Sequence, residues 1–175
     1  MSTFSISITG CAKGGIGYEY CKAFAEHNCH VIASNIPQRM NEMMELESDN
    51  IETLGLDVSS KESVSSAVST DPSMVTLIGT IVNIGSVVGK VPSPWAGSYC
   101  ASKAAVHAMS NTLRVELKPF GIGVVLELAG AIRSSFGSAS VERLGNDDWK
   151  LYKAPVWQRG AFHICQTGWG FGVWF

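Results

Sequence analysis

Short apolar runs alternate with amphipathic segments along this chain, which is the pattern of parallel strands joined by covering helices. The first run, FSISI, alternates apolar and polar residues, whereas CHVIAS and GVVLEL are nearly continuous and typical of buried strands. The longest helical pattern ends near Pro119 and Gly121, two residue types that terminate helices. We predict strands over 4–9, 29–34, 51–56, 77–84 (buried) and 123–128, and helices over 16–27, 39–47, 61–68 and 99–118.

The loop between the first predicted strand and helix reads TGCAKGGIG, residues 9–17. Its four glycines indicate a backbone that must approach a ligand closely, and a phosphate suits a loop that opens a helix. The spacing excludes a P-loop, because Ile16 and Gly17 follow Gly15 where that motif needs Lys and Ser or Thr. Its spacing also departs from G-x-G-x-x-G, the fingerprint of dinucleotide-binding loops. The loop can still offer amide groups to a pyrophosphate, and a purely structural turn is the alternative.

A second motif combines Ser86, at the end of a predicted strand, with Tyr99 and Lys103 in the sequence YCASK. Residues four apart on a helix share one face, so the Lys103 ammonium is expected beside the Tyr99 hydroxyl. A free tyrosine has a pKa near ~10, and a neighbouring cation favours the phenolate. The alternative is an ordinary amphipathic helix that happens to carry Tyr and Lys at this spacing.

Taken together, the two motifs resemble the short-chain dehydrogenase/reductase superfamily over residues 4–137, and residues 79–125 look most like its NADPH-dependent 1-acyldihydroxyacetone-phosphate reductase branch. The resemblance implies a Rossmann-like, doubly wound parallel sheet in three α/β/α layers. It also implies reduction of a carbonyl by hydride transfer. Ser86 would orient the substrate carbonyl, Tyr99 would donate the proton, and Lys103 would lower the tyrosine pKa and hold the nicotinamide ribose.

The same resemblance assigns cofactor contacts. No carboxylate follows the second predicted strand, where SNI stands, and this favours NADP(H) over NAD. Lys13 and Arg39 are candidate partners of the extra phosphate, with ordinary solvated charges as the alternative. The cofactor residues implied by the family are Gly10, Lys13, Gly15, Ile16, Gly17, Asp57, Val58, Tyr99, Lys103 and Ile132.

The chain also departs from the family. The stretch from Asp57 to Ser86 has room for only one crossover unit of roughly 30 residues, so one central strand and helix are expected to be missing. We expect the strand that ends before Ser86 to take the vacant place beside the first strand, which would restore its hydrogen bonds. We assign residues 1–153 to an incomplete Rossmann-type NADP-binding domain. Residues 154–175 form a divergent Gly/aromatic tail, expected to be poorly ordered, with a membrane-surface anchor as the functional alternative.

Composition narrows the function classes. A net charge of −2 and a pI near 6.1 provide no basic field for nucleic acid. Five cysteines without a CxxC pair predict neither a disulfide framework nor a zinc site, and we assign no metal. No apolar run is long enough to span a membrane, so we expect a cytoplasmic protein. The family resemblance implies that it could also associate with the surface of the endoplasmic reticulum or of lipid droplets.

Two functions from different classes follow. The first is an NADP(H)-dependent reductase acting on a small-molecule carbonyl, such as 1-acyldihydroxyacetone phosphate or a related lipid-like or steroid-like ketone. The second is a truncated, catalytically silent relative that at most binds nucleotide or a partner. A homo-oligomer is a possible partner state, weakened because the missing helix supplies much of the dimer interface in the family.

Overall fold

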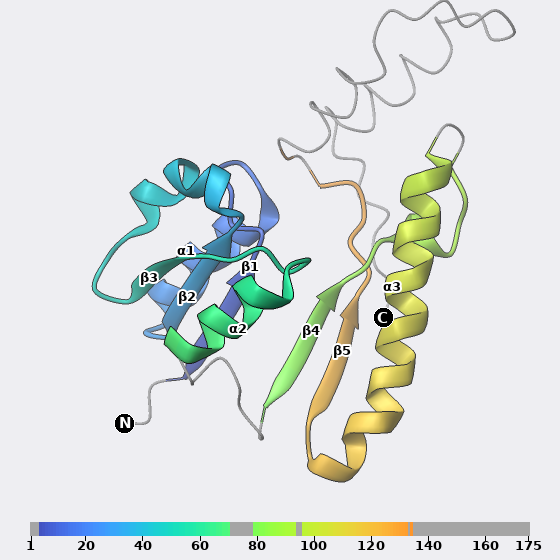
Figure 1. The fold of residues 1–175 in the computed structure, drawn as a ribbon. Helices are drawn as coiled ribbons and strands as arrows, with labels where there is room; N and C mark the ends of the chain where they lie inside the picture. The colour runs from blue at the N-terminus through green and yellow to red at the C-terminus, as the bar shows by residue number, and fades with distance from the viewer. Residues whose placement is uncertain (1–3, 71–78, 94–95, 133, 135–175) are drawn as a thin grey trace, which may run out of the picture. The chain divides into compact units, whose positions relative to one another are not determined.

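The computed structural model describes residues 4–70, 79–93, 96–132 and 134 (Figure 1). These residues belong to two compact units, one formed mainly by Met1–Val75 and the other mainly by Thr76–Arg133, and each is described by itself. The predicted domain boundary at residue 153 and the tail, 154–175, lie outside the described residues.

The first unit contains a parallel sheet of three strands in the order β1-β2-β3. Its central strand, β2, is buried at five of its six positions, as the continuous apolar run predicts. Three helices accompany the sheet, and α1 connects β1 to β2 (Figure 1). The elements are β1 (Ser5–Thr9), α1 (Ile16–Glu26), β2 (His30–Asn35), the 3-10 helix η1 (Pro37–Leu46), β3 (Ile51–Gly55) and α2 (Lys61–Thr70).

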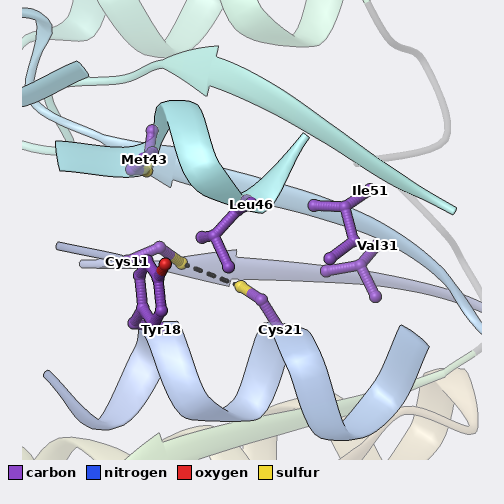
Figure 2. Packing of buried hydrophobic residues seen from close by; sticks show 8 residues of the cluster. Cys11, Tyr18, Cys21, Val31, Met43, Leu46 and Ile51 are labelled. Carbon is purple, nitrogen blue, oxygen red and sulfur yellow. Dashed lines mark hydrogen bonds between the residues drawn. The ribbon is translucent and has the colours of Figure 1, made fainter. Parts of the chain in front are cut away.

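The core of this unit lies where α1 and η1 meet the sheet. Figure 2 shows the α1 side chains Tyr18 and Cys21 pointing toward the same cluster as Leu46 of η1. Burial of these apolar side chains is the main favourable contribution to the stability of the unit. The buried cluster comprises Cys11, Tyr18, Cys21, Val31, Ala33, Met43, Leu46 and Ile51.

The segment predicted as a helix over 39–47 is a 3-10 helix that begins earlier, at Pro37. Arg39 has a non-helical backbone (φ −118°, ψ 16°), which interrupts the segment near its start. Its inward side chains are Met40, Met43 and Leu46, and this spacing of three is the period of a 3-10 helix. The apolar side chains therefore reach the core without an α-helical turn.

The second unit consists of two parallel strands and the long helix that connects them (Figure 1). α3 packs against β5 and against the short turn after β4. The chain leaves α3 through a 3-10 turn that contains Pro119 and then Gly121, whose φ of 74° lies in the left-handed region that glycine tolerates. The elements are β4 (Thr80–Ile84), the 3-10 turn η3 (Val87–Gly89), α3 (Gly97–Leu117), η4 (Lys118–Phe120) and β5 (Gly123–Glu127).

Two expectations about β4 are wrong. Its ladder joins it to β5, and among the described residues no ladder joins it to β1, so the expected pairing of β4 with the first strand is not found. β4 is also not buried, since Ile81 and Val82 are exposed. The reason is that a single crossover helix covers only one face of a two-stranded sheet. The described strands thus form two separate parallel sheets, with the α/β organisation that the sequence predicts.

Candidate functional site

The glycine-rich turn between β1 and α1 is built around two glycines with positive φ, Gly10 (76°) and Gly14 (78°). The amide of Gly15 donates to the carbonyl of Ala12 at 3.0 Å, and α1 begins directly afterwards. A Cβ on Gly17 would lie 2.8 Å from the carbonyl oxygen of Gly10, so the two backbone segments are in contact. The turn therefore presents backbone amides at a helix N-terminus, the arrangement that suits a phosphate group.

Cys11 anchors this turn, a role that the sequence analysis did not assign. Its thiol is fully buried, donates to the Ile8 carbonyl at 3.2 Å and receives a hydrogen bond from the Cys21 thiol at 3.4 Å (Figure 2). The hydrogen bond from Cys21 lowers the pKa of Cys11 and raises the pKa of Cys21. Because Cys21 belongs to α1, the contact ties the turn to the helix that it opens.

Both predicted phosphate partners are engaged with carboxylates of η1. The Lys13 ammonium lies 2.7 Å from both oxygens of Glu45, and Arg39 makes two hydrogen bonds to Glu42, at 2.6 and 2.7 Å. The side-chain hydrogen bond to Glu45 raises the pKa of Lys13, and the same contact lowers the pKa of Glu45. Lys13, Glu45 and Arg39 are exposed and Glu42 is partly exposed, so these pairs can open at low cost.

The end of β2 carries a buried donor without a partner. Asn35 accepts a hydrogen bond from the Ile36 amide at 2.9 Å, but its buried Nδ2 has no hydrogen-bond partner among the residues that the structure describes. An unsatisfied buried donor costs about 1–3 kcal/mol, so this atom is suited to a ligand oxygen. The sequence analysis noted only that Asn35 is not a carboxylate, and it did not assign a binding role to this side chain.

Asp57 and Val58 follow β3 in the same unit. The Asp57 carboxylate accepts from the hydroxyl and the amide of Ser59, at 2.6 and 2.9 Å, and the hydroxyl bond most strongly lowers its pKa. Val58 is exposed, and its contact with an adenine ring stays a prediction. The turn residues Gly10, Lys13, Gly15, Ile16 and Gly17 thus share one unit with Asp57 and Val58.

The second unit holds Ser86, Tyr99 and Lys103. Ser86 is buried directly after β4, and its hydroxyl accepts from the amide of Val88 at 3.4 Å. The Lys103 ammonium lies 5.7 Å from the centre of the Tyr99 ring and donates to the Ile84 carbonyl at 2.8 Å. Tyr99 and Lys103 therefore share one face of α3, and the position of the ammonium beside the Tyr99 hydroxyl stays a prediction. Ile132 lies in the same unit beyond β5 and is half exposed.

His107 is the residue of this region that sequence reasoning missed. It lies on α3 one helical turn beyond Lys103, and its Nε2 is 3.3 Å from the backbone nitrogen of Ser86. The available signal was the spacing of four that relates Tyr99, Lys103 and His107 along one helix face.

Two site types are not found in the described parts of the chain. Within them, no three His, Cys, Asp or Glu side chains gather as a metal site would require. No helix among these residues is both long and apolar enough to cross a membrane. His163 and Cys165, which could be imagined as a metal-binding pair, lie outside the described residues.

Comparisons with known proteins identify a family to which this chain is similar. A family model described as short chain dehydrogenase matches residues 71–144. The chain is 30% identical over 221 residues to the short-chain dehydrogenase srdE of Neurospora crassa, a match that covers 95% of this chain and 73% of the relative. It is 28% identical to the NADPH-dependent 1-acyldihydroxyacetone phosphate reductase of Schizosaccharomyces pombe, over 76% of this chain and 61% of that protein.

A solved short-chain dehydrogenase from Sphingobium yanoikuyae, in complex with NADPH, matches with a TM-score of 0.62 at 23% identity, over 78% of this chain and 74% of the other. The chain therefore belongs to the short-chain dehydrogenases, a family of oxidoreductases, and has a truncated Rossmann-like α/β fold. The match to srdE spans 221 positions, more than the 175 residues of this chain, so the relative contains residues that this chain lacks. This gap supports the predicted loss of an internal segment.

Proposed function

We propose that this chain is an NADP(H)-dependent carbonyl reductase. The observation that carries the proposal is the Lys103 ammonium 5.7 Å from the centre of the Tyr99 ring, on the helix that packs beside the turn containing Ser86. A cation in this position would stabilise the negative charge that forms on the phenol oxygen as it transfers its proton. The NADPH named for the S. pombe and S. yanoikuyae relatives supports the choice of cofactor.

In the proposed reaction, bound NADPH supplies a hydride to the carbonyl carbon of the substrate. The Ser86 hydroxyl donates a hydrogen bond to the carbonyl oxygen and holds it toward Tyr99. The Tyr99 phenol then transfers its proton to that oxygen, giving the alcohol, and Lys103 stabilises the phenolate that remains. The ammonium also holds the Ile84 carbonyl at 2.8 Å, which keeps the lysine close to the strand that precedes Ser86.

The first unit would hold the cofactor. Its glycine turn would bind the pyrophosphate through backbone amides, and Asp57 and Val58 would meet the adenine. The unpartnered Nδ2 of Asn35 fits an oxygen acceptor at the end of β2, where a carboxylate would instead select the ribose hydroxyl of NAD. Lys13 would add a positive charge for the extra phosphate of NADP.

The substrate class is a ketone, and the S. pombe relative supports 1-acyldihydroxyacetone phosphate or a similar lipid-like ketone as a candidate. The cytoplasm, the surface of the endoplasmic reticulum and that of lipid droplets remain predictions of location. A homo-oligomer with a reduced interface also remains a prediction.

Two observations favour a second function, a catalytically silent relative that binds nucleotide or a partner. The match to srdE is longer than this chain, and β4 belongs to a separate two-stranded sheet in the described residues. A chain that lacks part of the central sheet could keep the nucleotide-binding turn and lose turnover.

Turnover measurements separate the two functions. We expect the purified chain to oxidise NADPH only when a ketone is added, as followed by nicotinamide absorbance. Ser86→Ala should lower kcat about ten- to a hundredfold, because the carbonyl loses a positioning hydrogen bond. Ser93→Ala is the matched control, since Ser93 is exposed on the loop after η3, and it should leave the rate unchanged. NADPH binding without turnover across a broad panel of ketones would overturn the reductase and support the silent relative.

A second prediction concerns cofactor choice. Glu45→Gln should tighten NADPH binding about two- to fivefold and leave NADH binding unchanged, because it frees the Lys13 ammonium from a carboxylate. The gain should shrink as salt is added. Titration calorimetry measures both affinities, and Glu26→Gln provides the matched control because Glu26 is exposed at the last position of α1. An equal change for NADPH and NADH would contradict a role for Lys13 at the extra phosphate.

A further inference from the structure

We propose that His107 is a positioning residue that holds Ser86 in place for the reaction through the Ser86 backbone amide. The inference rests on the proposed function of Ser86 as the residue that orients the carbonyl. It assigns a role to a buried imidazole that the proposed reaction does not itself use.

The contact is shielded from water. His107 Nε2 lies 3.3 Å from the Ser86 nitrogen, and the two residues are 7% and 6% exposed. The backbone N–H can only donate, so Nε2 must carry a lone pair, and the ring proton of the neutral imidazole must then sit on Nδ1. The interaction thus requires one tautomer of His107.

The chain around Ser86 leaves space for this ring. A Cβ on Gly85 would lie 2.6 Å from His107 Nε2, and a Cβ on Gly89 would lie 2.5 Å from His107 Cε1. Real Cβ atoms do not approach other heavy atoms so closely, so side chains at either position would displace the imidazole. The sequence GSVVG therefore places Ser86 between glycines that admit the ring.

Three polar contacts join α3 to the end of β4. Lys103 donates to the Ile84 carbonyl at 2.8 Å, and Asn83 donates through Nδ2 to the Ser110 hydroxyl at 3.0 Å. Of the three, the contact from His107 is the one that reaches Ser86. The Ser86 hydroxyl has a longer interaction, 3.4 Å, with the amide of Val88, which holds it weakly.

The consequence is a fixed spacing between the serine and the tyrosine. Tyr99, Lys103 and His107 lie at intervals of four on one helix, so they share a face of α3. The hydrogen bond that the Ser86 amide donates to His107 fixes the position of the serine relative to the same helix that carries the phenol. Displacements of about 1 Å between reacting groups cost up to about a hundredfold in rate. A contact that fixes the distance between Ser86 and Tyr99 should therefore favour the reaction.

A matched pair of variants separates positioning from space filling. His107→Leu fills the site without an acceptor, whereas in His107→Gln the Oε1 atom can take the place of Nε2. The Ser86 amide, read in a ¹H–¹⁵N spectrum of the full chain, should shift and exchange with solvent about tenfold faster in the Leu variant. The Gln variant should stay close to the wild type.

Kinetics provide the second measurement. His107→Leu should lower kcat about ten- to a hundredfold with little change in KM, and His107→Gln should recover most of the rate. Combined with Ser86→Ala, the Leu change should add little further loss, because both act through one side chain. An unchanged kcat in the Leu variant of an active enzyme would overturn the positioning role.

The outcomes stay distinguishable from failure of the proposed function. If the wild type shows no turnover, the reductase fails, while the Ser86 amide still reports whether His107 holds it. An amide signal that is the same in the Leu variant and the wild type would overturn the contact. If both variants unfold, the ¹⁵N shifts of the wild-type imidazole test the inference, because they show which ring nitrogen carries the proton. A proton on Nε2 contradicts the inference, and a proton on Nδ1 agrees with it.

Discussion

Tyr99→Phe should reduce kcat for ketone reduction about 10²- to 10⁴-fold, the range that general acid catalysis contributes. The substitution removes one oxygen atom, the proton donor of the proposed reaction. It keeps the ring, and with it the contact to the Lys103 ammonium 5.7 Å from the ring centre, so the packing of α3 should not change. NADPH affinity and KM should therefore remain near the wild-type values, which is the signature of an interaction made only in the transition state.

Steady-state rates and calorimetric NADPH titration test this result together. Tyr20→Phe removes the same atom from α1, in the other unit, and should leave kcat unchanged. A Tyr99→Phe chain that reduces ketones at the wild-type rate would remove Tyr99 from the proposed reaction. Equal losses in kcat and in NADPH binding would instead indicate a structural effect on the second unit.

Gly17→Ala should destabilise the first unit by about 1–3 kcal/mol. It should also weaken NADPH binding more than tenfold, which corresponds to a loss of about 1.4 kcal/mol or more in binding free energy. The added Cβ would lie 2.8 Å from the Gly10 carbonyl oxygen and 3.3 Å from that of Thr9. Both atoms belong to the backbone of the glycine turn, so relief requires the turn to open away from α1. The amides that we propose for the pyrophosphate would move with it.

Urea unfolding measures the change in stability, and titration with NADPH measures the change in affinity. Gly97→Ala is a suitable control, because a Cβ there meets nothing within 4 Å and Gly97 begins α3. That substitution should be neutral or stabilise by up to about 1 kcal/mol. If Gly17→Ala unfolds at the wild-type urea concentration, the close approach of the turn to α1 does not constrain the fold.

Several elements were predictable because local periodicity determines them. The apolar run CHVIAS predicts a strand over 29–34, and β2 occupies His30–Asn35. The glycines of TGCAKGGIG predict a tight turn into a helix, and α1 begins at Ile16. The spacing of four between Tyr99 and Lys103 predicts their shared face on α3, where the ammonium lies 5.7 Å from the ring centre. Each of these features depends on residues close together in the chain.

Other features depend on residues far apart, and these the pattern did not predict. Lys13 and Glu45 form an ion pair although 32 positions separate them, and His107 reaches Ser86 across 21 positions. The partner of β4 was also wrongly expected, because pairing depends on which strand lies beside it in space. Strand type is encoded in a few neighbouring residues, whereas strand order is decided by packing of the whole sheet.

The amino-acid sequence by itself determined the alternation of strands and helices, the glycine turn and the spacing of Tyr99 and Lys103, because backbone periodicity and the φ freedom of glycine act locally. Only the tertiary structure decided that Lys13 is bound to Glu45, that Asn35 keeps a buried donor without a partner, and that His107 supports Ser86. The physical reason is that hydrogen bonds and ion pairs depend on positions in space, which distant parts of the chain reach only when they pack.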